Sequence, residues 1–356
     1  MELNSMLPTN AKLALYMEQS LTIPAGKMGH GVLRYSPNEI SAVIDSEFAG
    51  RSTGEFGFPR DIPIVASVED AAALGANVFV LGIAPSGGAI PTEWFTVIDR
   101  AVELKMSLVN GLHDRLGARY MDLPRLESAK PDAQWVWDIR VEPTGLVNGT
   151  GLAAKFNNRR VLIIGTDMAV GKMTAGLEIN RLALERGIKS AFVATGQIGI
   201  TITGGGVPLD CVRVDFASGS IEREVVAASS AGADLVIIEG QGSLAHPSST
   251  ANLPLLRGSC PTHLLLCVRA KQEHLKMLEH IKVPDLRQFI TLYEDLAEAA
   301  GTYLRPKTVA VAVNTAHLPE AEAIPAIKEI EDRLQLPAAD PVRQGPARLL
   351  DALVSP

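Results

Sequence analysis

The sequence predicts an α/β protein built from two parallel sheets, and three observations support this class. Short apolar, β-rich runs alternate with longer helical patterns along the chain, as in βαβ units. The length of 356 residues suits two domains with separate cores. A glycine-containing loop with a lysine, GTDMAVGKMT at 165–174, directly follows one of the apolar runs.

The N-terminal domain is expected over residues 1–145. Its strands are predicted in five apolar runs, at 12–17, 40–45, 62–66, 77–84 and 106–110. Helical patterns lie between them, including 93–105 and 68–75, where Gly75 can end a helix in the left-handed conformation. This alternation predicts a Rossmann-like parallel sheet. Residues 121–158 are rich in Pro, Gly and charge, and we interpret them as the connection between domains.

A second sheet is expected in the C-terminal domain, residues 146–356. Its strands are predicted at 160–165, 190–195, 234–240, 263–268 and 308–314. The loop at 165–174 joins the first of these strands to a helical pattern over 172–186, which Gly187 ends. A buried strand, a glycine loop and a helix in this order are the setting of a phosphate-binding loop. The sequence therefore predicts a P-loop NTPase-like parallel sheet.

Composition argues against several classes of protein. The formal net charge of −7 argues against a nucleic-acid partner, which needs a clustered basic face. Cys211, Cys260 and Cys267 show no C-x-x-C spacing, so neither a disulfide framework nor a structural zinc site is expected, and a reducing, cytoplasmic setting is. Apolar runs are too short for a membrane span, and residues 1–10 lack a signal pattern. We expect a small-molecule substrate, no membrane partner and a homo-oligomer.

The loop at 165–174 departs from the usual phosphate loop in two ways. Five residues instead of four separate Gly165 from Gly171, and Met173 stands where Ser or Thr supplies a magnesium ligand. Lys172 still supplies the positive charge. Thr174 can offer a hydroxyl from the next position, although one step along a helix turns a side chain by about 100°. The loop is expected to hold a phosphate, either as an anchor or for phosphoryl chemistry.

Two resemblances extend this interpretation. The loop residues Gly165, Thr166, Asp167, Val170, Gly171 and Lys172 resemble the longer loop of dethiobiotin synthetases and related P-loop amide-forming enzymes, and IIEGQGS at 237–243 resembles their acidic-strand motif. A second resemblance covers almost the whole chain. The segments GKMGHGVLRYSPNEISAVIDSEFAGR, IAPSGG, VNGLHD, GTDMAVGKMT, EGQGSLAHP and PDLRQFITLYEDLA are similar to the two-domain family associated with D-glutamate N-acetyltransferase.

The second resemblance implies transfer of an acetyl group from acetyl-CoA to the amino group of a D-amino acid, with D-glutamate expected, in D-amino-acid catabolism. Acetyl-CoA is then a co-substrate, and the loop can anchor its phosphates without breaking a phosphoryl bond. ATP with magnesium is the alternative ligand of the loop. Two other classes stay open: an ATP-dependent ligase of the dethiobiotin synthetase type, and a nucleotide-binding protein without catalysis.

Acyl transfer to an amine needs a proton acceptor and donors for the developing oxyanion. Glu239, at the end of a predicted strand, and His246, in the polar loop that follows, are the candidate bases. Ser243 is a candidate oxyanion donor, together with Gln241 and the N–H groups of the turn at 240–243. Glu239 and Thr174 can instead bind magnesium if the ligand is a nucleotide.

Coenzyme or nucleotide binding is expected at the phosphate loop and at two further strand ends. Gln197 lies in TGQIGITITGGG (195–206), where a second ligand-facing loop is expected, and Asn314 ends the last long strand, from which it can contact an adenine edge. Asp167 and Asp215 are candidates for orienting the amine or a metal. The predicted cofactor-binding set is Gly165, Thr166, Asp167, Val170, Gly171, Lys172, Met173, Thr174, Gln197 and Asn314.

The N-terminal domain offers a candidate site of its own. GKMGHG (26–31) is glycine-rich, and Asp45 ends a strand at the position from which a carboxylate can bind a ribose. No complete G-x-G-x-x-G follows the first strand, which argues against NAD. The turns at 83–88 and 109–114 resemble those of CoA-binding domains of acyl-CoA ligases, and the coenzyme can lie here instead. The predicted site residues of these turns are Ser86, Gly87, Gly88, Asn110 and His113, and the candidates for holding the substrate are Arg34, Arg51 and His113.

Overall fold

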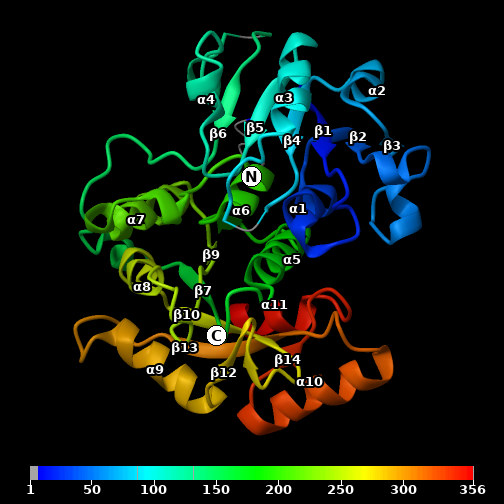
Figure 1. The fold of residues 1–356 in the computed structure, drawn as a ribbon. Helices are drawn as coiled ribbons and strands as arrows, with labels where there is room; N and C mark the ends of the chain where they lie inside the picture. Colours follow the sequence, from blue (N-terminus) through cyan, green and yellow to red (C-terminus); the bar gives the residue numbers. More distant parts are fainter. Residues whose placement is uncertain (1–6, 86, 131, 356) are drawn as a thin grey trace. The chain divides into compact units, whose positions relative to one another are not determined.

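The computed structural model describes residues 7–85, 87–130 and 132–355 (Figure 1). The chain folds into two compact units. Within the described residues, the N-terminal unit comprises residues up to 141 together with 197–211, and the C-terminal unit comprises 142–196 and 212–355. The sequence did not predict that residues 197–211 belong to the N-terminal unit.

Among the described residues, six parallel strands form the sheet of the N-terminal unit, in the order β3-β2-β1-β4-β5-β6. They are β1 (Lys12–Tyr16), β2 (Glu39–Ile44), β3 (Ile64–Val65), β4 (Val78–Leu81), β5 (Ser107–Asn110) and β6 (Val136–Asp138). The order reverses between β1 and β4, as in a Rossmann fold. Strand β6 lies within 121–158, so the prediction of a plain connection there was wrong for these residues.

The helices of this unit are α1 (Lys27–Tyr35), α2 (Val68–Ala73), α3 (Trp94–Glu103), α4 (Leu116–Arg119) and α6 (Gln197–Thr203). The motif GKMGHG begins α1 and does not form an open loop. Its glycines allow close packing: a Cβ on Gly29 would lie 2.4 Å from the sulfur of Met17, and the Gly29 N–H donates to the carbonyl of Gly82 at 2.8 Å. Gly75 has the predicted positive φ, +85°.

In the described part of the C-terminal unit, six parallel strands follow the order β14-β13-β10-β7-β9-β8. They are β7 (Arg159–Gly165), β8 (Ser190–Val193), β9 (Leu235–Ile238), β10 (His263–Arg269), β13 (Lys307–Asn314) and β14 (Ala338–Ala339). The antiparallel strands β11 (His274–Leu275) and β12 (Leu278–Lys282) form a separate hairpin. The two parallel sheets confirm the predicted α/β class.

The helices of the C-terminal unit are α5 (Lys172–Glu185), α7 (Val214–Ser230), α8 (Asn252–Ser259), α9 (Leu286–Glu298), α10 (Glu320–Leu334) and α11 (Ala347–Val354). Helices α7, α8 and α9 pack in sequence along one side of the sheet, whereas α5 and α11 pack together on the other (Figure 1). Gly176 brings α5 close to the sheet, since a Cβ there would lie 2.6 Å from Ile163 and Phe192. Strand β7 is thereby covered on both faces.

Short 3-10 helices lie at Pro24–Gly26, Ser46–Phe48, Thr53–Phe56, Leu126–Ser128, Leu152–Lys155 and Leu209–Cys211. None of the helices in the described ranges combines the length and the apolar character that crossing a membrane requires.

Candidate functional site

The phosphate loop connects β7 to α5 at the carboxyl edge of the C-terminal sheet. Gly171 has φ +104°, a conformation that favours glycine, and it directly precedes the first helical residue, Lys172. The Thr166 N–H donates to the carbonyl of Cys267 at 3.1 Å, which fixes the start of the loop to β10. The free N–H groups of a helix N-terminus are thus presented beside a lysine, which is an arrangement that binds anions.

Lys172 is buried, with 5% of its surface exposed, and its ammonium turns back onto the loop. Nζ donates to the carbonyls of Asp167 at 2.8 Å and Met168 at 3.1 Å. Burial lowers the pKa of Lys172 to about 8, although Cys267, Asp167 and Glu239 act in the opposite direction. The ammonium is therefore held by neutral carbonyls inside the loop, where a phosphate would be a better partner.

Two glycines make room for this lysine. A Cβ on Gly240 would lie 1.7 Å from the carbonyl oxygen of Ile163 and 3.2 Å from Cδ of Lys172. A Cβ on Gly165 would lie 3.2 Å from Nζ of Lys172. The backbone after β9 can therefore approach β7 closely only because position 240 has no side chain.

Glu239 directly follows β9, the strand next to β7, and only 4% of it is exposed. Its Oε2 accepts hydrogen bonds from the N–H groups of Thr195 at 2.8 Å and Gly196 at 3.2 Å. Burial raises the pKa of Glu239 to about 7, against the lowering effect of these hydrogen bonds and of Lys172. A carboxyl group that titrates near neutral pH can accept and release a proton under physiological conditions.

The carboxylate of Asp167 accepts hydrogen bonds from other groups of the chain. Oδ2 accepts hydrogen bonds from Nε2 of Gln272 at 2.7 Å and from the N–H of Lys276 at 2.7 Å, while Oδ1 accepts from the N–H of Met168 at 2.6 Å. The side chain thereby ties the phosphate loop to the hairpin of β11 and β12. Sequence reasoning missed Gln272 and Lys276, because the short hairpin gives no strong strand pattern.

The other residues predicted at the loop are placed as follows. Val170 is buried against Gly165, and Met173 and Thr174 are half-buried in the first turn of α5. Asn314 ends β13, and its Nδ2 lies 3.5 Å from the position of a Cβ on Gly171. The structure therefore brings Asn314 to the loop, and its contact with an adenine edge stays a prediction.

Gln197 is placed differently. It begins α6 in the N-terminal unit, where its Cγ lies 3.3 Å from the position of a Cβ on Gly111. The prediction of a ligand-facing loop over 195–206 is corrected here, because residues 197–203 form a helix that packs with α1. Asp215 lies exposed in the first turn of α7.

Ser243 and His246 lie in the loop after Glu239, which is held largely by its own hydrogen bonds. The hydroxyl of Ser243, which is fully buried, accepts from the Ala245 N–H at 3.1 Å. His246 is half-buried, and its Nδ1 accepts from the Ser248 N–H at 3.2 Å. Gln241 donates from Nε2 to Oγ1 of Thr195 at 3.1 Å, which connects this loop to the end of β8. The catalytic roles of Ser243 and His246 stay predictions.

The residues proposed for the N-terminal unit are dispersed over it. Arg34 is half-buried in the last turn of α1, and His113 is exposed after β5. Arg51 is exposed; it pairs with Glu55 at 3.0 Å, and its guanidinium lies 4.3 Å from the centre of the Phe56 ring. Ser86 lies outside the described residues.

Asp45 is fully buried at the end of β2, and its carboxylate accepts hydrogen bonds from the N–H groups of Leu21 at 3.3 Å and Glu47 at 3.2 Å. The position predicted for ribose binding therefore stabilises the loop after β1.

Comparison with known proteins identifies relatives of both units. Residues 147–350 match the model of DUF1611, described as a P-loop domain of unknown function, and residues 46–142 match its N-terminal partner, described as a Rossmann-like domain. These matches confirm the predicted types of the two sheets.

Two named proteins and one solved structure resemble the chain closely. It is 37% identical over 343 residues to the D-glutamate N-acetyltransferase of Tritonibacter scottomollicae, covering 96% of this chain and 98% of that protein. It is 38% identical over 280 residues to the D-glutamate N-acetyltransferase of a Pseudoalteromonas species, covering 78% and 82%. A crystal structure of a DUF1611 protein from Anabaena variabilis, 45% identical, superimposes with a TM-score of 0.89 and covers 96% of this chain and 99% of that one.

Proposed function

This chain belongs to the DUF1611 family, and on that premise we propose that it is an amino-acid N-acetyltransferase that moves the acetyl group of acetyl-CoA to the amino group of D-glutamate. N-acetylation of this kind would serve D-amino-acid catabolism. The structural observation that carries the proposal is the pair formed by Glu239 and Lys172. A buried carboxyl group with a pKa of about 7 lies beside a lysine in a phosphate-binding loop.

The loop has the features that binding the phosphates of coenzyme A requires. Gly171 exposes the N-terminus of α5, a helix of 14 residues, and Lys172 adds a positive charge whose present partners are two backbone carbonyls. Anchoring needs only these backbone donors and the charge. Phosphoryl transfer additionally needs a precisely held magnesium ion, and Met173 stands where its hydroxyl ligand is usually found.

Glu239 is the group best suited to take the proton from the substrate amine. Acetyl-CoA supplies the activated acyl group. The amino nitrogen must lose its proton to bond to the acetyl carbon, and the carbon–sulfur bond of the thioester breaks, so that coenzyme A leaves as a thiol. The hydrogen bonds from Thr195 and Gly196 hold Oε2 in place. A pKa near 7 matches the carboxylate to proton transfer at neutral pH, where Brønsted behaviour makes a general base most effective.

An ATP-dependent ligase is the second candidate function, and one observation favours it. Glu239 ends the strand next to the phosphate-loop strand, at the carboxyl edge where parallel sheets bind ligands. A carboxylate there, with Thr174 in the first turn of α5, can bind the magnesium of a nucleotide. The first proposal is preferred because of the named relatives and because of Met173.

A paired turnover assay separates the two functions. Thiol release from acetyl-CoA and phosphate release from ATP are followed separately with D-glutamate, with L-glutamate and without an amino acid. Lys172→Ala is compared with Lys189→Ala, which removes an exposed lysine of the same unit. We expect thiol release that needs D-glutamate, proceeds without ATP and is lost only in Lys172→Ala. Phosphate release coupled to the amino acid, with acetyl-CoA inert, would refute the acetyltransferase proposal.

A further inference from the structure

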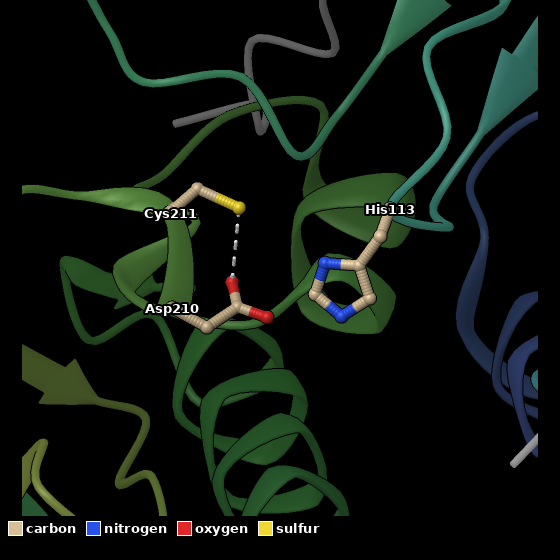
Figure 2. A group of neighbouring side chains, drawn as sticks. All are labelled: His113, Asp210 and Cys211. Atoms are coloured by element: carbon tan, nitrogen blue, oxygen red, sulfur yellow. Dashed lines mark hydrogen bonds between the residues drawn. The ribbon is translucent and has the colours of Figure 1, made fainter. Parts of the chain in front are cut away.

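Three side chains that bind metals well converge in the N-terminal unit, apart from the residues of the phosphate loop. His113 follows β5, and Asp210 and Cys211 end the 3-10 helix at Leu209–Cys211, on the segment that joins this unit from the second half of the chain. Figure 2 shows the imidazole facing the carboxylate and the thiol. One nitrogen, one oxygen and the sulfur all lie within 4.8 Å of one another, and Sγ of Cys211 lies 3.6 Å from Oδ1 of Asp210.

The backbone around His113 is firmly positioned. The His113 N–H donates to the carbonyl of Gly88 at 2.8 Å, and a Cβ on Gly88 would lie 2.5 Å from Cδ2 of the imidazole. Gly88 also has φ +69°, so a larger residue there would be strained and would displace the ring. Asn110 fixes the following turn through Nδ2, which donates to the carbonyl of Asp114 at 2.6 Å and to Oδ1 of Asp138 at 2.7 Å.

Asp210 is oriented by a neighbouring charge. Nε of Arg140, whose side chain is only 12% exposed, lies 3.0 Å from Oδ2 of Asp210. This leaves Oδ1 on the side of Cys211. Carboxylates that bind metals are commonly oriented by a second partner, and for Asp210 this partner is the charge of Arg140, in an ion pair without hydrogen-bond geometry.

The combination of donors selects one class of metal. An imidazole nitrogen, a carboxylate oxygen and a thiolate sulfur are the ligands of Zn²⁺, whereas Mg²⁺ and Ca²⁺ prefer oxygen alone. His113 and Asp210 are exposed and Cys211 is half-buried, so the point between them is open to solvent. We propose that His113, Asp210 and Cys211 bind a Zn²⁺ ion through three protein ligands, with the fourth position open.

Zinc binding at this site must displace a proton from the thiol. A metal ion deprotonates a coordinating thiol, and its apparent affinity therefore rises with pH. The sequence argued against a structural zinc site because the cysteines lack C-x-x-C spacing; this site combines residues far apart in the chain and contains a single cysteine.

The test uses the whole chain, stripped of metal with a chelator and then dialysed against Zn²⁺ or Co²⁺ under reducing conditions. We expect about one metal ion per chain in the wild type and in His280→Ala, which removes an exposed histidine on β12. Cys211→Ser, His113→Ala and Asp210→Asn should each weaken zinc binding at least about tenfold. The Co²⁺ protein should show a thiolate charge-transfer band that Cys211→Ser abolishes.

Thermal unfolding separates loss of metal binding from loss of the fold. Without metal, the three variants should unfold near the wild-type temperature, and Zn²⁺ should raise the Tm of the wild type but not of the variants. Equal zinc content in the wild type and in all three variants would overturn the proposal. An acetyl group found on Cys211 after acid quenching with acetyl-CoA, in protein that retains no zinc, would also overturn it and make Cys211 a nucleophile. Both results are independent of whether D-glutamate is the acetyl acceptor.

Discussion

Thr195 donates two hydrogen bonds to Glu239 across the carboxyl ends of β8 and β9. The Thr195 N–H donates to Oε2 of Glu239 at 2.8 Å, and Oγ1 of Thr195 donates to the backbone carbonyl of Glu239 at 2.8 Å. The pair fixes both the backbone and the carboxylate of the proposed base. It also gives that carboxylate one orientation before any substrate binds, which is what proton transfer in a reactive complex requires.

Replacement of the proposed base is the first prediction. Glu239→Gln keeps the size of the side chain but removes its ability to accept a proton, so we expect turnover with D-glutamate to fall by about 10²- to 10⁴-fold. Binding of acetyl-CoA, measured by calorimetry, should stay close to that of the wild type. Glu279→Gln, an exposed change on β12, serves as the control. A variant that keeps most of the wild-type rate would exclude Glu239 as the base.

The pH dependence of kcat/KM follows from the two shifted groups. The pKa of Glu239 is raised to about 7, so activity should rise with pH through this value as the carboxyl group becomes a base. The pKa of Lys172 is lowered to about 8, so activity should fall above this value as the loop loses its charge. A bell-shaped profile for the free enzyme is therefore expected, with apparent values that belong to the interacting pair. An unchanged rising limb in Glu239→Gln would contradict this assignment.

Lys172 should lower the free energy of unfolding of the ligand-free protein, although it strengthens the binding of acetyl-CoA. Because its pKa falls from 10.5 to about 8 on folding, the buried ammonium costs free energy at neutral pH. Lys172→Met should raise the free energy of unfolding at pH 7 by about 1–3 kcal/mol. It should also weaken acetyl-CoA binding by about 10- to 100-fold, because a charge-assisted contact to phosphate is lost.

Urea denaturation as a function of pH gives the sign of this effect. Between about 8 and 10.5, the unfolded chain binds a proton at Lys172 that the folded protein does not, so wild-type stability should rise with pH and approach that of Lys172→Met. Lys189→Met, at an exposed position, is the control. Its free energy of unfolding should follow that of the wild type over the same pH range. A less stable Lys172→Met protein at pH 7 would mean that the hydrogen bonds to Asp167 and Met168 outweigh the cost of burial.

Asp167 provides a prediction about the hairpin of β11 and β12. Asp167→Ala removes the acceptor of Gln272 Nε2 and of the Lys276 N–H, and we expect it to destabilise the protein by about 2 kcal/mol in urea denaturation. Hydrogen exchange should increase in residues 272–282. Asp215→Ala, in the exposed first turn of α7, should cost at most about 1 kcal/mol. Unchanged exchange in the hairpin would show that Asp167 does not hold it.

Much of the fold was predictable from the sequence because buried parallel strands are continuous apolar runs. The runs that became β7, β9, β10 and β13 each precede a polar or glycine residue at the carboxyl edge of the sheet, so the phosphate loop and Glu239 could be placed before the structure was known. Strand β6 was missed because three residues, Val136–Asp138, are too few to show a period.

The remaining errors have tertiary causes. GKMGHG was named as part of a candidate site because it is glycine-rich, but its glycines allow close packing of α1 against Met17 and Gly82, a contact that no local pattern reveals. Asp45 has the sequence position of a ribose ligand, yet its carboxylate binds the N–H groups of Leu21 and Glu47. The zinc ligands proposed above meet because residues 197–211 fold with the N-terminal unit, which propensity and spacing along the chain do not encode.

The most direct test of the central claim is detection of the acetylated product. The purified chain is incubated with acetyl-CoA that carries an isotopically labelled acetyl group, with D-glutamate and without ATP, and the reaction is analysed by mass spectrometry. The account predicts labelled N-acetylglutamate that forms from D-glutamate and disappears with Glu239→Gln. Absence of labelled product from the wild type, together with amino-acid-dependent consumption of ATP in a parallel reaction, would contradict it.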